Sequence, residues 1–169
     1  MSLEGTNHDR LFLFVDMLPQ SRHFAVGEYV CGYFPHITVG TVQTKRTDEV
    51  LETIQMVSST TAPFEVQRGD LMIVGNRRKK IASKIIDFGE FQRYQHQMFD
   101  AIAHVPDTAI GRRTAYTHRR GPHISHSYPE YAAFDIPNKF EINSLTIATT
   151  LNFHDIHHRN KILDITHLK

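Results

Sequence analysis

The chain has 169 residues, 40% of them hydrophobic and 22% charged, which is typical of a globular domain that folds without disulfides or metals. A formal net charge of +1 gives no general preference for polyanions. The sequence contains no run of roughly 18 apolar residues, which is the length that a membrane-spanning helix needs. The single cysteine, Cys31, excludes a disulfide within the chain. A lone thiol and no export signal predict a cytoplasmic protein.

The first half of the chain alternates between apolar runs and helical patterns. Residues 11–15 form a continuous apolar run, and residues 29–39 have an extended pattern interrupted at Pro35, so both segments are predicted as strands. Apolar side chains then recur at helical spacing and predict a helix over residues 47–57. The strands predicted next are residues 64–66, 71–74 and 81–86.

The second half repeats this order. A helix is predicted from residue 90 to about residue 104, ended by Pro106, and the polar, arginine-rich residues 107–121 are predicted as a loop. The remaining predicted strands are residues 123–127, 140–142, 145–151 and 162–165. Many strands with few helices favour an α+β fold of antiparallel sheets with helices packed on their outer faces. Residues 6–169 should form this single domain, after a leader or disordered terminus at residues 1–5.

One short motif occurs twice. Pro-His-Ile-Thr at residues 35–38 recurs as Pro-His-Ile-Ser at residues 122–125, 87 positions further along the chain. Alternate residues of a strand share a face, so His36 and Thr38 should project together while Ile37 points into the core. The second copy has the same alternation, and a pseudo-twofold relation would make the two copies face each other across a cleft.

Such a cleft suits phosphodiester cleavage, which needs a base to activate water and an acid to protonate the departing oxygen. His36 and His123 can supply both, one neutral and one protonated, and a bell-shaped dependence of rate on pH would follow. The hydroxyls of Thr38 and Ser125 can donate hydrogen bonds to the phosphoryl oxygens. This scheme requires no metal and no other cofactor.

At these residues the chain resembles the two-histidine (2H) phosphoesterases, a superfamily that includes LigT-like RNA 2′,5′ ligases and cyclic nucleotide phosphodiesterases. The signature of that superfamily is a pair of His-apolar-Thr/Ser-apolar motifs. The resemblance covers nearly the whole chain, from about residue 11 to residue 168. It implies a bilobal, duplicated α+β fold in which two antiparallel sheets form a central cleft, with helices on the outer faces.

The resemblance also implies roles for the motif residues. His36 and His123 would be the catalytic acid and base, in an order that stays open, and Thr38 and Ser125 would bind the phosphate. The expected activity is metal-independent hydrolysis of cyclic phosphodiesters, at the 2′,3′-cyclic phosphates of nucleotides or RNA ends. RNA 2′,5′ ligation is an alternative. A cytoplasmic monomer with a nucleotide or RNA-end substrate, no cofactor and no membrane association is expected.

Residues around the motifs are less specific. Tyr33 and Tyr128 flank the two copies and can stack on a base or pack in the protein. His126 stands where the signature has an apolar residue, so either its side chain points toward the core or the strand ends before it.

Two other functions compete with this interpretation. The His-Asp-Ile-His-His run at residues 154–158 concentrates possible zinc ligands, although it matches no firm spacing rule. The second competitor is a non-catalytic module that binds RNA or a nucleotide through the same cleft. Turnover of cyclic phosphates would separate this module from an enzyme.

Overall fold

The computed structural model describes residues 8–17, 24–31, 35–74, 80–112, 114–117, 121–125, 136–150 and 159–169. The strands of this part of the chain are β1 (Asp9–Asp16), β2 (Tyr29–Cys31), β3 (His36–Thr44), β4 (Phe64–Val74), β5 (Lys80–Ile86), β6 (Thr108–Ile110), β7 (His123–Ser125), β8 (Lys139–Ile142), β9 (Ser144–Thr150) and β10 (Arg159–His167). The helices are α1 (Thr47–Ser59) and α2 (Glu90–Ile102). The α+β class is confirmed.

Most predicted elements are present, with two differences. The strands predicted at residues 64–66 and 71–74 are one strand, β4, whose register against β5 shifts between Arg68 and Leu71. The prediction of a loop over residues 107–121 was wrong in part, because β6 forms there and pairs with β3. Neither feature has a strong local pattern, because each depends on a partner strand elsewhere in the chain.

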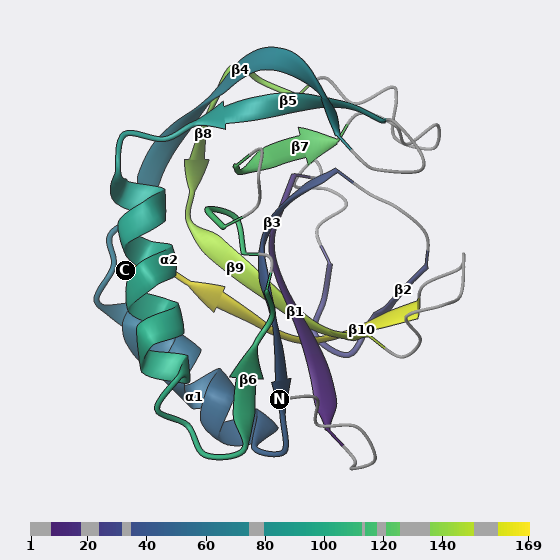
Figure 1. Ribbon diagram of the computed structural model, residues 1–169, viewed down its shortest axis with the longest axis vertical. Coiled ribbons are helices and arrows are strands. Elements are labelled where there is room, and N and C mark those ends of the chain that lie inside the picture. Colours follow the sequence, from purple (N-terminus) through teal and green to yellow (C-terminus); the bar gives the residue numbers. More distant parts are fainter. Residues whose placement is uncertain are drawn as a thin grey trace.

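The strands form one sheet, which corrects the expected pair of sheets. Its order is β2-β10-β9-β1-β3-β7-β5-β4-β8, with β6 paired to β3 off this path, and the paired strands are antiparallel. The short strand β7 joins the two groups of strands, since it pairs with β3 on one side and with β5 on the other. Figure 1 shows β7 between the β4–β5 hairpin and the β1–β3 pair.

The two helices pack against each other on the same side of the sheet, rather than on separate outer faces (Figure 1). The hydroxyls of Ser58 on α1 and Tyr94 on α2 are buried and joined by a hydrogen bond of 2.6 Å. Burial raises the pKa of Tyr94 to about 12, although the hydrogen bond with Ser58 opposes this.

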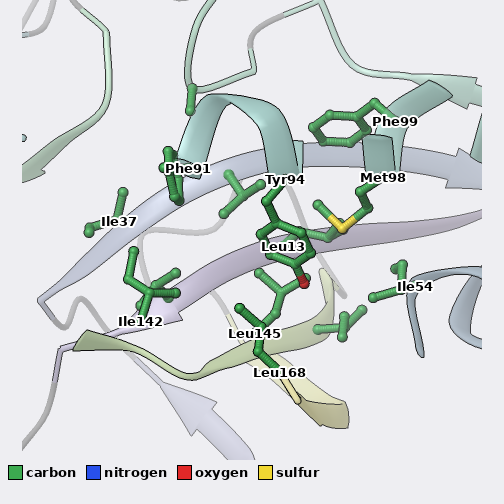
Figure 2. Packing of buried hydrophobic residues seen from close by; sticks show 14 of the residues in the cluster. Leu13, Ile37, Ile54, Phe91, Tyr94, Met98, Phe99, Ile142, Leu145 and Leu168 are labelled. Carbon is green, nitrogen blue, oxygen red and sulfur yellow. The ribbon is translucent and has the colours of Figure 1, made fainter. Parts of the chain in front are cut away.

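The main core lies between this helix layer and one face of the sheet (Figure 2). It includes Ile54, Phe91 and Met98 from the helices, together with Leu13 and Ile37 from the sheet. The opposite face carries a smaller apolar cluster of Phe14, Val30, Ala148 and Ile162. The sheet therefore buries apolar side chains on both faces, which explains the continuous apolar run in β1. Across the described ranges, no helix is long and apolar enough to cross a membrane.

Candidate active site

The two motifs lie on neighbouring strands in the centre of the sheet. Ile37 of β3 is directly opposite Ile124 of β7 in an antiparallel pair. Positions on either side of this pair also oppose each other, so the register places Thr38 beside His123 and His36 beside Ser125. Directly opposed Cα atoms in such a ladder are about 4.5–5.5 Å apart. Two segments separated by half the chain thus come within side-chain contact range.

The side chains alternate between the two faces as the sequence predicted. Ile37 and Ile124 are both fully buried and belong to the main core beneath the helices. His36, Thr38 and His123 are half-buried, and strand alternation directs them to the opposite face. Ser125 is the last residue of β7, and the structure describes its backbone but not its side chain.

The proline that precedes each histidine has the same role in both copies. The carbonyl of Pro35 accepts a hydrogen bond of 3.1 Å from the backbone N–H of Met17, which follows β1. The carbonyl of Pro122 accepts one of 3.0 Å from the backbone N–H of Ile85 on β5. Proline has no N–H to return, so each ladder is incomplete at the start of the motif strand, where proline is tolerated. The two histidines therefore enter the sheet in equivalent backbone settings.

The His36 ring packs against two aromatic rings. Its centroid is 5.4 Å from that of Phe12 and 5.8 Å from that of Phe14, and both contacts are edge-to-face. A hydrogen bond of 3.2 Å joins His36 Nε2 to Thr38 Oγ1. The aromatic contacts and the hydroxyl together orient the imidazole.

His123 is held by a backbone carbonyl. Its Nδ1 lies 2.9 Å from the carbonyl oxygen of Gly121, and because that oxygen can only accept, Nδ1 carries a proton. Nε2 is then the nitrogen at which the ring takes or gives a second proton. Gly121 has a φ of 68°, a left-handed conformation that favours glycine. The Gly-Pro-His sequence thus encodes a backbone turn that fixes the imidazole tautomer.

A β-bulge in β3 lies next to the first motif. Leu13 pairs with Gly40 and Phe14 with Thr38, so Val39 is an extra residue in β3. A Cβ atom on Gly40 would lie 2.5 Å from Cζ of Phe99, a clash that glycine avoids. The bulge adjusts the direction of the strand between the helix contact at Gly40 and the site at Thr38.

Several predicted residues lie outside the described part of the chain: Tyr33, His126, Tyr128 and the histidine-rich residues 154–158. Their assigned roles stay predictions. Within the described ranges, no group of three or more His, Cys, Asp or Glu side chains is placed to hold a metal ion.

Sequence reasoning missed three contributors to the site, Phe12, Phe14 and Gly121. The apolar run of β1 predicted a buried strand, but it did not reveal that the rings of Phe12 and Phe14 contact His36. The Gly-Pro pair before His123 was a visible turn signal that could have indicated the carbonyl contact.

Comparison with known proteins supports this fold. No protein-family model matches the sequence, and no curated protein matches it. Among solved structures, TT0787 of Thermus thermophilus matches with a TM-score of 0.60 and 15% identity, over 94% of this chain and 97% of that one. LigT of E. coli, complexed with 3′-AMP, matches with a TM-score of 0.59 and 15% identity, over 96% and 99%. A structure described as a phosphoesterase matches with a TM-score of 0.58 and 16% identity, over 96% and 99%.

The fold class is therefore that of an antiparallel α+β protein with a motif pair on two central strands. More particularly, the chain has the fold of LigT over nearly its whole length, in agreement with the resemblance of the motifs.

Proposed function

We propose that this chain is a metal-independent phosphoesterase of the 2H type, which hydrolyses cyclic phosphodiesters at the 2′,3′-cyclic phosphates of nucleotides or RNA ends. One observation carries the proposal: the pairing of Ile37 with Ile124 sets both His-apolar-hydroxyl motifs on one face of one sheet. Neither motif alone would be informative, since a single half-buried histidine is common in proteins.

The proposed reaction uses the two imidazoles in opposite protonation states. The neutral one removes a proton from water as the water oxygen attacks phosphorus. The bond from phosphorus to one ribose oxygen breaks, and that oxygen takes both the electron pair and a proton from the imidazolium. The product is a phosphomonoester on the other ribose oxygen. Proton exchange with solvent restores the starting state.

The surroundings of the histidines suit these roles. The carbonyl of Gly121 holds the Nδ1 proton of His123, so Nε2 can act toward the substrate. The hydroxyl of Thr38 lies beside His123 by register and can donate a hydrogen bond to a phosphoryl oxygen, whose negative charge increases in the transition state. We assign the same role to Ser125.

Structures with the same fold support a nucleotide substrate. LigT of E. coli has been solved in complex with 3′-AMP, phosphate, NADP+ and ATP. A ribose phosphate is common to the nucleotides among these ligands, and it is also the reacting part of a 2′,3′-cyclic phosphate.

RNA 2′,5′ ligation is the second candidate activity. It would use the same two imidazoles with a ribose hydroxyl in place of water as the nucleophile. A non-catalytic nucleotide-binding module is the third candidate, and it would need the face but no proton transfer.

The test is turnover of a panel that contains 2′,3′-cyclic nucleotides, RNA with a 2′,3′-cyclic end and 2′,5′-linked dinucleotides. Hydrolysis by the wild type is expected, and His36→Ala and His123→Ala should each lower kcat by about 10²- to 10⁴-fold. His96→Ala is the matched control, because His96 is exposed on α2 in the helix layer on the other side of the sheet. Circular dichroism would confirm that each variant is folded.

The outcomes separate the candidates. Binding of nucleotides without turnover would favour the module, and joining of RNA ends without hydrolysis would favour the ligase. Loss of activity in His96→Ala equal to that in the motif variants would contradict the proposed site.

A further inference from the structure

A lysine on β5 lies directly across from the second motif histidine. The antiparallel pairing of β5 with β7 places Lys84 opposite His123 and Ala82 opposite Ser125. Ile85 is buried in the main core, so alternation directs the exposed Lys84 side chain to the face that carries His123. The run of residues across the sheet is therefore Thr38, His123 and Lys84.

The hydrogen-bond pattern brings Lys84 and His123 particularly close. The backbone N–H of Ile85 bonds to the carbonyl of Pro122, which makes this a hydrogen-bonded position of the ladder. Hydrogen-bonded and non-hydrogen-bonded pairs alternate along antiparallel strands, so Lys84 and His123 form a non-hydrogen-bonded pair. In such pairs the Cα atoms are only about 4.5 Å apart and the side chains are closest.

The Lys84 ammonium makes no ion pair within the described part of the chain. Gly69 and Asp70 oppose it on β4, where the register shifts, and Asp70 is the nearest carboxylate by register. The two side chains are both exposed and are not bridged. Lys84 can therefore offer all three of its N–H donors to a ligand.

We propose that Lys84 is a further substrate-binding residue of this site, whose ammonium contacts the non-bridging oxygens of the phosphodiester held between His36 and His123. The inference rests on the proposed function for the identity of the substrate. A compact ammonium on a flexible stem is a common phosphate ligand in proteins. The corresponding position beside His36 is Asp16 of β1, a carboxylate that would repel the same anion. The charges on the two sides of the motif pair therefore favour contact of the phosphate with Lys84 over contact with Asp16.

The test measures binding of inorganic phosphate and turnover of a 2′,3′-cyclic nucleotide in wild type, Lys84→Met and Lys84→Arg. Methionine keeps most of the length of the side chain without the charge. Lys84→Met should weaken phosphate binding roughly ten- to a hundredfold and raise KM by a similar factor, and Lys84→Arg should restore most of both. Lys139→Met on the edge strand β8 is the control, since Lys139 is also an exposed lysine of the sheet and should have no effect.

The two readouts distinguish the failure of this inference from the failure of the proposed function. Wild-type turnover with unchanged phosphate binding and KM in Lys84→Met would overturn the role of Lys84 alone. No turnover by the wild type, with phosphate binding lost in Lys84→Met and kept in Lys139→Met, would overturn the enzymatic function and support the anion contact. Failure of the wild type to bind phosphate would overturn the inference.

Discussion

The two motif strands begin with the same Pro-His step but hold their histidines by different means. In β3 the imidazole of His36 packs on two phenylalanine rings and bonds to a hydroxyl. In β7 the imidazole of His123 is held by a backbone carbonyl at a left-handed glycine. The neighbouring charges also differ, because Asp16 is opposite His36 and Lys84 is opposite His123.

This difference indicates how a repeated motif can serve an asymmetric reaction. The shared register places both imidazoles on one face of the sheet. One can then act on the attacking water while the other acts on the departing oxygen of the same phosphorus atom. The unequal surroundings can then give the two sides separate tasks, since one side is apolar and acidic and the other polar and basic. The following predictions test where the two motifs act together and where they act separately.

The largest effect is expected from removing both histidines. If the two imidazoles act on one phosphorus atom, their losses should not multiply. A double His36→Ala/His123→Ala variant should be no more than about tenfold slower than either single variant, because groups that act as a unit are strongly non-additive. Measured kcat values for the two single variants and the double variant decide this. Losses that multiply would mean that the motifs contribute independently.

A second prediction concerns the core that supports both motifs. Burial raises the pKa of Tyr94 from 10.0 to about 12, so an unfolded chain loses this proton at a lower pH than the folded chain does. The free energy of unfolding should therefore be nearly unaffected by this group below pH 10 and should fall by about 2 kcal/mol as the pH rises to 12, toward a limit of about 3 kcal/mol above that pH. Urea unfolding at several pH values measures it.

Tyr94→Phe is the control for this alkaline effect. It removes the titrating hydroxyl, so the decline between pH 10 and 12 should become shallower, although stability at pH 7 should fall by about 1 kcal/mol from the lost bond to Ser58. Ile37 and Ile124 both pack in the same core, so both motifs should lose order together. An equally steep decline in Tyr94→Phe would contradict the assignment.

A third prediction separates the motifs at the bulge. Gly40→Ala places a methyl group against the Phe99 ring and should destabilise the fold by about 1–3 kcal/mol, as overpacking of a core does. The distortion should reach Thr38 on β3 before it reaches β7. Chemical shifts of the His36 and His123 ring protons report this, and equal changes at both rings would argue against a local effect.

A fourth prediction affects the second motif. Gly121→Ala puts a side chain on a residue with a φ of 68°, so the turn should relax and move its carbonyl away from His123 Nδ1. A drop in kcat of about tenfold is expected, equal to about 1.4 kcal/mol, with little change at His36. Nitrogen NMR of the imidazoles would show whether the tautomer preference of His123 has weakened. Unchanged tautomers and kcat would contradict the proposed role of the carbonyl.

The smallest effect is expected from Asp16→Asn. Removing a negative charge beside His36 should strengthen phosphate binding by about threefold, which is the scale of one charge about 6 Å away in water. This is opposite in sign to the effect expected for Lys84→Met. Isothermal titration with phosphate measures both variants, and weaker binding in Asp16→Asn would show that the carboxylate supports the site instead.

The sequence was sufficient to predict features with a local cause. Both helices begin at the predicted residues, since their apolar stripes repeat at helical spacing. The faces of Ile37 and Ile124 followed from strand alternation alone. The pair of histidines was found because the motif occurs twice.

Features that depend on strand pairing could not be predicted in this way. One sheet and two sheets differ only in the partners of β7, and the pattern of its three residues predicts a strand without saying which strands it pairs with. The same holds for β6, whose partner β3 lies more than 60 positions earlier. The neighbours of the histidines, Asp16 and Lys84, are also set by register, so their importance was invisible before the strands were aligned.

The short strand β7 has a consequence for how this protein must fold. A shift of one residue along β3 would exchange the faces of His123 and Ile124, because side chains alternate strictly along a strand. Ile124 would then leave the core, and His123 would leave the face that carries His36. Selection for a well-packed interior and selection for chemistry therefore act on the same alignment. A chain that folded with this one-residue shift in register would be compact but catalytically inactive.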